Sequence, residues 1–273
     1  MNYYAGIDIG STAIKLVVID EEQNLLGSKV AATGALVEKN SMEAYRQLLT
    51  EVGLKESDIS YLTTTGYGRK LIQSADETIS EITANALGAR KMGEEFGVVR
   101  TIINIGGQDT KAISLDEHGT VVNFAMNDRC AAGTGRFLDM AARNLEISVE
   151  QLGEFHFNAK GTPAAVNATC AVFAESEIIG LLGGGHSREE IVAGVHFSIA
   201  KRTIRLTKRV GINDVLYFDG GPALNKGLVA AIEDELGKTL AIPKNPQVTT
   251  AFGAALQGQE VHLFELSEER EQA

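Results

Sequence analysis

Two cysteines have the residue type and surroundings best suited to chemistry, and they are the only cysteines in this chain. Cys130 and Cys170 each stand three residues after an asparagine, Asn127 and Asn167, and each is followed by a run that favours helix. A thiol near a helix N-terminus lies beside unpaired N–H groups and the positive end of the helix dipole, which favour the thiolate that a metal binds. The pair therefore predicts a metal site with Cys130 and Cys170 as ligands.

Two other interpretations of the cysteines stay open from the residues alone. They could be thiols buried in the core, as free cysteines often are, or a disulfide, which is disfavoured in a chain so poor in cysteine and without a secretory signal. An iron–sulfur cubane needs about four thiolates, and one chain supplies two. If the cysteines are ligands, a two-fold dimer that shares one cluster is the simplest closed arrangement.

Three glycine-rich turns, each directly after an apolar run, form the second group of candidate residues. Backbone N–H groups of such turns cradle phosphate oxygens, and carboxylates nearby can hold Mg²⁺, usually through water. The candidates of the first turn are Asp8 for Mg²⁺ and Gly10, Ser11, Thr12, Ala13, Ile14 and Lys15 for the nucleotide. Those of the other two turns are Gly106, Gly107, Gln108 and Asp109, then Gly220, Gly221 and Pro222, with Gln247 as a possible neighbour. Lys15 could instead be a surface lysine at the end of a strand.

The first turn recurs along the chain. Residues 7–15 align without a gap on residues 103–111, and the register continues through the acidic pairs 20–21 and 116–117. Either this is coincidence or a β-meander has been duplicated, and the shared Ile, Gly, Lys and Asp positions favour duplication. Two copies of such a hairpin predict two similar lobes with a nucleotide clasped between their loops.

The elements that must position these residues follow from periodicity and turn chemistry. Strands are predicted at 3–9, 13–19, 25–32, 59–65, 215–218 and 240–242, and helices at 136–145, from Cys170 to 182, 187–210 and 226–236, with a closing helix from 247. Residues 155–163 are predicted as loop or irregular strand. The expected domains are an N-terminal lobe, 1–95, and a C-terminal lobe, 96–260, that carries the cysteines. The helix near 250–262 could pack back on the first lobe, and 267–273 form a polar, frayed tail.

Composition narrows the possible partners. The chain has 273 residues, of which 44% are hydrophobic and 22% charged, as in ordinary soluble globular proteins. A net charge of −11 argues against a nucleic-acid partner. The absence of an apolar run of roughly 18 residues argues against a membrane span, and without a signal-peptide pattern the expected location is cytoplasmic. The second half of the helix at 187–210 is basic, which we interpret as a solvated face rather than a docking surface.

The three turns occur in the order of the two phosphate loops and the adenosine loop of the sugar kinase, Hsc70 and actin fold. With the cysteines added, the sequence resembles the activators of 2-hydroxyacyl-CoA dehydratases. These are ATP-dependent iron–sulfur electron donors in the same broad family as the ATPase subunits of benzoyl-CoA reductase. The resemblance runs from Gly6 to about Gln257 and is most specific at residues 106–109, 127–135 and 174–177.

The resemblance implies an α/β fold of two duplicated actin/Hsc70-like (ribonuclease H-like) lobes around a nucleotide cleft. It implies ATP or ADP with Mg²⁺, and a homodimer with one [4Fe-4S] cluster held by Cys130 and Cys170 of each chain. Ferredoxin or flavodoxin would supply the electron, and a 2-hydroxyacyl-CoA dehydratase would receive it. Within the cleft we assign Asp109 and Gln108 to the metal or the attacking water. Arg129 and Thr134 are expected to tune the cluster.

Three other functions remain open. One is an electron-donating ATPase for a related CoA-ester or double-cubane reductase. Another is a small-molecule kinase of the same fold, with Asp109 as general base and incidental cysteines. The last is a nucleotide-dependent regulator without steady ATP turnover. The substrate of a partner dehydratase leaves no trace in these residues, because that substrate would not touch this chain.

Overall fold

The computed structural model describes residues 2–128, 131–166 and 170–272, so Arg129 and Cys130 lie outside the described residues. The chain forms two compact units. Unit 1 comprises Met1–Gly97, His118–Val121 and Gln247–Ala273, and unit 2 comprises Val98–Glu117 and Val122–Pro246. The second lobe was expected to run to residue 260, whereas unit 2 ends at Pro246 because the helix that follows packs on unit 1.

The sheet of unit 1 has the order β3-β2-β1-β4-β5. Its strands are β1 (Tyr3–Ile9), β2 (Ala13–Ile19), β3 (Leu25–Ala32), β4 (Ile59–Thr65) and β5 (Glu77–Thr78). The central strand β1 runs antiparallel to β2 and parallel to β4. All of β1 after Tyr3 is buried, as its near-continuous apolar sequence requires. The bounds predicted for β1 to β4 are confirmed.

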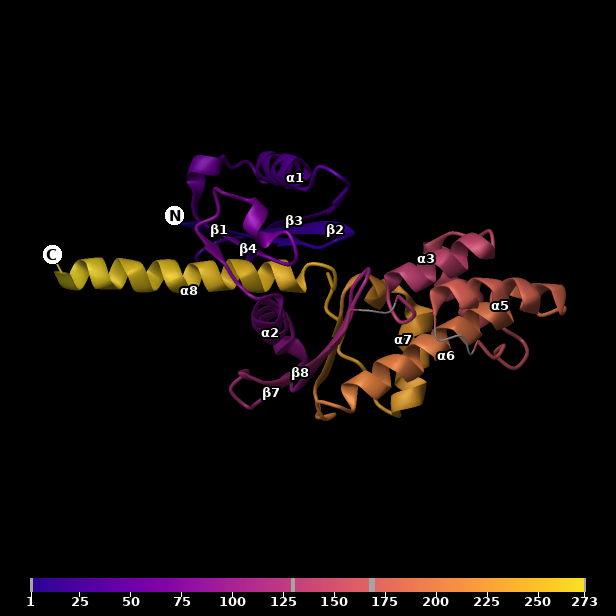
Figure 1. Ribbon diagram of the computed structural model, residues 1–273. Helices are drawn as coiled ribbons and strands as arrows, with labels where there is room; N and C mark the ends of the chain where they lie inside the picture. The colour runs from indigo at the N-terminus through magenta and orange to yellow at the C-terminus, as the bar shows by residue number, and fades with distance from the viewer. Residues whose placement is uncertain (1, 129–130, 167–169, 273) are drawn as a thin grey trace. The chain divides into compact units, whose positions relative to one another are not determined.

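Helices cover both faces of this sheet (Figure 1). Helix α1 (Val37–Glu51) packs on β2 and β3, α8 (Thr249–Gln272) packs on β1, β2 and β4, and α2 (Glu81–Met92) packs on α8. The helices α2 and α8 approach very closely, since a Cβ on Gly253 would lie 1.7 Å from the Ala84 carbonyl oxygen.

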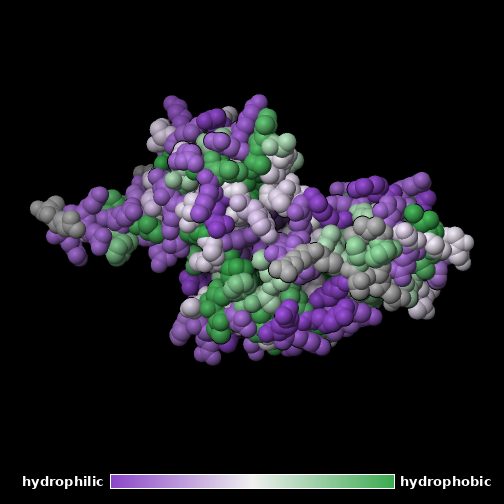
Figure 2. Space-filling view, viewed as in Figure 1, coloured by the Kyte–Doolittle hydropathy of each residue, from purple (hydrophilic) through white to green (hydrophobic). Residues whose placement is uncertain are grey.

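The far end of α8 differs from its prediction. The tail expected to fray from residue 267 is helical through Gln272. Its Glu and Arg residues are good helix formers, and they continue the helix into solvent. Hydrophilic residues cover most of this end of α8 in Figure 2. Among the described residues, no helix combines the length and the apolar character needed to cross a membrane.

The sheet of unit 2 repeats the design of the first, with the order β8-β7-β6-β9. Its strands are β6 (Thr101–Ile105), β7 (Thr110–Leu115), β8 (Val121–Asn127) and β9 (Leu216–Asp219). Strand β6 runs antiparallel to β7 and parallel to β9, as β1 does to β2 and β4. The predicted duplication is therefore confirmed, while the strand expected at 240–242 is only an isolated bridge between Tyr217 and Ala241.

The helices of unit 2 enclose a core of their own. They are α3 (Gly135–Asn144), α4 (Leu152–Asn158), α5 (Ala171–Gly183), α6 (Arg188–Thr207) and α7 (Lys226–Leu236). The capping box predicted from Ser187 and Glu190 is present at the start of α6. Short 3₁₀ helices in the chain lie at Glu56–Asp58, Arg69–Leu71, Glu94–Phe96, Val149–Gln151 and Gly221–Leu224.

The prediction of a loop at residues 155–163 is wrong in its first part. A capping box at Ser148 starts a 3₁₀ turn that runs directly into α4. The fully buried Leu152 and the half-buried Phe155 anchor this helix to the core. Tertiary burial thus decides the conformation of a short segment that has no clear periodicity.

Helix α4 contributes to a buried histidine pair. His196 of α6 is fully buried, its Nδ1 lies 3.1 Å from His156 Nδ1, and its Nε2 lies 3.0 Å from Asn225 Nδ2. Asn225 Oδ1 accepts from the amides of Gly227 and Leu228, which fixes the Asn225 amide as a donor to His196. His196 must then donate from Nδ1 to His156. Burial, with the neighbouring His156, lowers the pKa of His196 to about 3, so the His196 ring is neutral at neutral pH.

Candidate functional site

The first glycine turn joins β1 to β2. The Gly10 amide donates to the Ala13 carbonyl at 3.1 Å, and the Thr33 side chain donates to the Gly10 carbonyl at 2.7 Å. Ser11 and Thr12 at its tip are exposed, and Ala13 is half-buried. Ile14 is fully buried in the core, so a ligand could meet only its backbone. The turn is therefore a braced backbone hairpin with two hydroxyl side chains at its open end.

Asp8 and Lys15 face each other across β1 and β2. They are directly paired in the strand register, and Lys15 Nζ lies 2.9 Å from Asp8 Oδ2. The other carboxylate oxygen, Oδ1, is buried and has no hydrogen-bond partner among the described residues. A buried carboxylate oxygen is costly to leave without a partner. This oxygen fits a hydrated Mg²⁺ ion, as the sequence predicted for Asp8.

The second glycine turn joins β6 to β7 in unit 2. The Gly106 amide donates to the Asp109 carbonyl at 2.9 Å, which repeats the Gly10 to Ala13 bond of unit 1. Gly107 and Gln108 are half-buried at the tip of the turn. Asp109 Oδ1 lies 2.8 Å from Lys111 Nζ, and both side chains are more than 90% buried. This ion pair orients the Asp109 carboxylate at the base of the turn.

The third glycine turn follows β9 and lies beside the second. Gly220 adopts a φ of +95°, and a Cβ there would lie 2.1 Å from the Ile105 carbonyl oxygen, so only glycine fits. The Gly220 amide donates to the Pro246 carbonyl at 2.8 Å. Gly221 is half-buried, Pro222 is buried and Gln247, one residue after Pro246, is half-buried. Unit 2 thus brings two of the three predicted turns together at the ends of adjacent parallel strands.

Sequence reasoning missed two features of these turns. Gly66, with a φ of +85°, ends β4 beside Ile9, so it is the counterpart of Gly220 in unit 1. Asn104 donates to Asp219 at 2.8 Å, which joins β6 to β9 below the second and third turns. The sequence shows that Gly66 directly follows a predicted strand, but it does not show that this strand, β4, pairs with β1. No local pattern pairs residues 104 and 219.

The segment after Cys130 is bonded to the second turn. The Gly135 amide donates to the Gly106 carbonyl at 2.9 Å, and the Arg136 amide donates to the Gly107 carbonyl at 3.0 Å. These are the first two residues of α3, whose N-cap residue Thr134 has no side-chain cap bond. The turn carbonyls therefore cap α3, and a shift of the turn would move the start of this helix.

Cys170 is the N-cap residue of α5 and is an exposed free thiol. It therefore lies at the helix N-terminus that the sequence predicted, and the interpretation as a buried core thiol is wrong for this residue. Helix α5 packs against α3. No cluster of three or more His, Cys, Asp or Glu side chains that could hold a metal occurs in the described part of the chain. An exposed thiol at a helix N-terminus nevertheless fits a cluster that takes its other ligands from elsewhere.

Two lobes with duplicated sheets and a glycine turn after the first strand of each define the actin, Hsc70 and sugar kinase fold, as predicted. Residues 5–258 match the family described as the BadF/BadG/BcrA/BcrD ATPase family. The chain belongs to this family of ATPases.

Its relatives include activators of 2-hydroxyacyl-CoA dehydratases, so the predicted resemblance is confirmed. The 2-hydroxyisocaproyl-CoA dehydratase activator of Clostridioides difficile is 42% identical over 254 residues, which are 93% of this chain and 94% of that protein. The activator of lactoyl-CoA dehydratase of Anaerotignum propionicum is 42% identical over 258 residues, 94% of this chain and 98% of that one. A solved structure of the Clostridium difficile activator with bound ADPNP has a TM-score of 0.91 at 40% identity, covering 97% of each chain.

Proposed function

We propose that this ATPase is an iron–sulfur activator that uses ATP to drive single-electron transfer to a 2-hydroxyacyl-CoA dehydratase. The observation that carries the idea is the pair of hydrogen bonds from the Gly135 and Arg136 amides to the second glycine turn. A turn that responds to the phosphates of a nucleotide would act directly on the helix that follows Cys130. The names of the relatives support the same acceptor enzyme.

Each unit of the chain has a role in the proposed activity. In unit 1, the amides of the first turn with Ser11, Thr12 and Lys15 bind phosphate, and Asp8 holds Mg²⁺ through water. In unit 2, Asp109 and Gln108 orient the attacking water, while Gly220, Gly221 and Pro222 lie against the adenosine. Gln247 is a neighbour of the adenosine in the same proposal. The nucleotide favours the backbone arrangement that best fits its phosphates, and thereby shifts the population of α3 positions.

The metal centre is proposed to be one [4Fe-4S] cluster per homodimer, with Cys130 and Cys170 of each copy as its four ligands. When bound, such a cluster supplies a one-electron carrier. Cys170 would hold it from the exposed N-terminus of α5, where the helix dipole favours the anionic thiolate. A ferredoxin or flavodoxin is the proposed reductant. The chain is equally similar, at 42%, to activators of two different dehydratases, so the acceptor is proposed as a class.

Anaerobic purification followed by iron and sulfide analysis tests this function. Wild type should be brown and contain about four irons per dimer. Cys170→Ala and Cys130→Ala should each lose the iron, whereas Ser176→Ala, an exposed polar residue on the same helix as Cys170, should retain it. ATP hydrolysis should persist in the colourless variants, because the three glycine turns remain. A colourless wild-type protein that hydrolyses ATP only with an added acceptor would contradict the electron-donor function and favour a kinase.

A further inference from the structure

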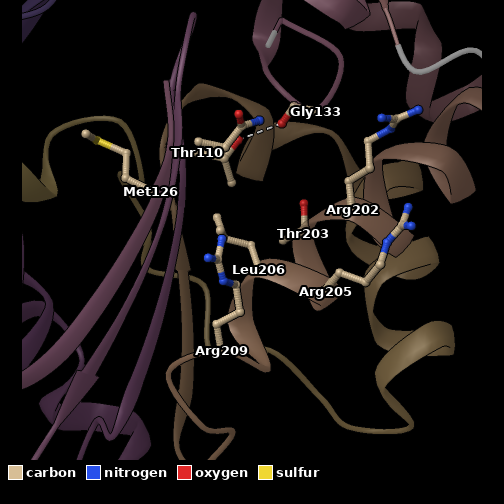
Figure 3. A pocket seen from close by; sticks show the side chains of 9 residues that line it. Thr110, Met126, Gly133, Arg202, Thr203, Arg205, Leu206 and Arg209 are labelled. Carbon is tan, nitrogen blue, oxygen red and sulfur yellow. Dashed lines mark hydrogen bonds between the residues drawn. The ribbon is translucent and has the colours of Figure 1, made fainter. Parts of the chain in front are cut away.

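Unit 2 contains a hollow of about 360 Å³ that none of the nucleotide or cysteine assignments uses. Its walls come from β7, the end of β8, the segment before α3, the second half of α6 and the turn that follows α6. The residues that line it are Thr110, Met126, Asn127, Gly133, Arg202, Thr203, Arg205, Leu206 and Arg209. Figure 3 shows most of these side chains around the hollow.

The hydroxyl of Thr203 is the unusual group in this hollow. Thr203 is only 2% exposed, and its Oγ1 has no hydrogen-bond partner among the residues that the structure describes. In Figure 3 it points toward the hydrogen bond that Thr110 donates to the Gly133 carbonyl at 2.7 Å. A buried hydroxyl without a partner is costly, so the geometry favours a ligand that accepts a hydrogen bond from it.

Three arginines line the same hollow. Arg202 and Arg205 are three residues apart on α6, which places them on one side of the helix, and Arg209 lies two residues beyond the end of α6 at Thr207. Arg205 donates from Nε to the Lys201 carbonyl at 3.2 Å. Within the described residues, neither Arg205 nor Arg209 has a carboxylate within ion-pair distance. A row of such cations is notable in a chain with a net charge of −11.

We propose that this hollow binds a small oxyanion, with a phosphate group as the best match. A tetrahedral dianion can accept from the Thr203 hydroxyl and from the planar forks of two guanidinium groups at once. The Thr203 hydroxyl is a buried donor of this hollow. A free small anion can enter a hollow more readily than a side chain that is fixed to the flat surface of a partner protein. The volume is within the range of ligand pockets, about 300–1,000 Å³.

An anion bound in the hollow would also affect the segment that contains Cys130. Asn127 and Gly133, which line it, stand three residues before and three residues after Cys130 in the sequence. A bound anion would therefore tie both ends of the cysteine segment to α6. This inference does not depend on the proposed electron transfer, because its ligand and its test involve neither iron nor a partner enzyme.

Calorimetric titration with inorganic phosphate tests the site. The protein is first saturated with ADPNP, so that phosphate cannot bind at the glycine turns, and chloride keeps the ionic strength constant. Wild type should bind phosphate saturably. Arg205→Gln with Arg209→Gln should weaken binding at least tenfold, and the nearly isosteric Thr203→Val about tenfold, as expected for a hydrogen bond to a charged group.

The matched control is Lys208→Gln, which removes the same charge from the C-cap residue of α6, outside the hollow, and should leave binding unchanged. If Lys208→Gln weakened phosphate binding as much as the other substitutions, the effect would come from the net charge of the protein, and the proposed site would be wrong. Linear, non-saturable heats in wild type would overturn it as well. Binding of polyglutamate without binding of phosphate would overturn it in favour of a docking surface for an acidic protein.

Discussion

The β-meanders of the two units share a backbone and differ in where they carry their carboxylate. In unit 1 the acid is Asp8, on the strand, and in unit 2 it is Asp109, in the turn. The position equivalent to Asp8 in unit 2 is Asn104, and the position equivalent to Asp109 in unit 1 is Ala13. The lysines are equivalent, because Lys15 and Lys111 occupy the same place in β2 and β7.

This difference is the basis for the two different roles that we propose for the two hairpins. The turn hydrogen bond is kept, from Gly10 to Ala13 and from Gly106 to Asp109, so the amide cradle is duplicated intact. Moving the carboxylate by five positions changes what it can reach. Asp8 has one buried oxygen without a hydrogen-bond partner among the described residues, whereas Asp109 stands at the base of the turn beside Gly106.

The largest expected effect concerns the burial of the two ion pairs. The side chain of Lys111 is 3% exposed and that of Lys15 is 23% exposed. Lys111→Met should lower the free energy of unfolding by about 3–5 kcal/mol, because it leaves a buried carboxylate without its cation. Lys15→Met also removes the cation from a buried carboxylate, but it should cost less, about 1–3 kcal/mol, because Lys15 itself is partly exposed and water can take the place of its ammonium group. Urea denaturation of the two variants measures the difference, and equal losses would mean that the two pairs are equivalent.

Substitutions of the two carboxylates, Asp8 and Asp109, should have different effects on the kinetics of ATP hydrolysis. Asp109→Asn is expected to lower kcat about a hundredfold or more at saturating Mg²⁺, because a proton acceptor near the attacking water is lost. Asp8→Asn should instead raise the Mg²⁺ concentration required for half-maximal rate, with a smaller change in kcat. Steady-state assays with Mg²⁺ titration check this, with the exposed Glu117→Gln as control. Matching profiles for the two variants would refute the division of roles.

The third comparison is between Gly220, which follows the parallel strand β9, and Gly237, which follows helix α7. Gly220→Ala should destabilise the protein by about 2–4 kcal/mol, because it combines a left-handed φ with a collision against a backbone carbonyl. Gly237→Ala is the matched control, since Gly237 has a φ of +65° but open space around its Cβ position. It should cost about 1 kcal/mol. A similar loss at both positions in urea denaturation would mean that backbone strain outweighs the collision.

The last expected effect is a pH dependence that belongs to unit 2. Burial lowers the pKa of His196 to about 3, well below its usual value, and lowers that of His156 as well. Unfolding therefore takes up protons in mild acid, so the stabilisation is complete above pH of about 6.5 and is lost as pH falls toward about 3. The expected slope is about 1.4 kcal/mol per pH unit for each such proton.

His196→Gln should reduce this slope, because glutamine can keep both hydrogen-bonding directions without titrating. Urea denaturation at pH 7, 6 and 5 measures it. His186→Gln, at a histidine that is 43% exposed, is the control and should leave the slope unchanged. A slope that survives His196→Gln intact would assign the proton uptake to other groups.

The sequence was most informative where local pattern and burial agree. The alternation of residues 3–9 and 13–19 predicted β1 and β2 to the residue, and the constant offset between repeats predicted the second sheet. It was least informative about contacts between distant segments, such as Asn104 with Asp219, because neither residue carries a local signal of its partner. The helix α4 was missed because its seven residues are too few to show a period. Cys170 at the start of α5 was predictable, while Cys130 lies outside the described residues.

The contact between Gly253 and Ala84 has a consequence for biosynthesis. Unit 1 begins at the N-terminus, yet the helix that covers one face of its sheet is α8, the last in the chain. A ribosome therefore releases nearly all of unit 2 before the first sheet can be covered, although domains usually fold in the order of synthesis. The unit whose sheet is made first is therefore completed only after unit 2, when α8 has been synthesised and can cover the face that α1 leaves open.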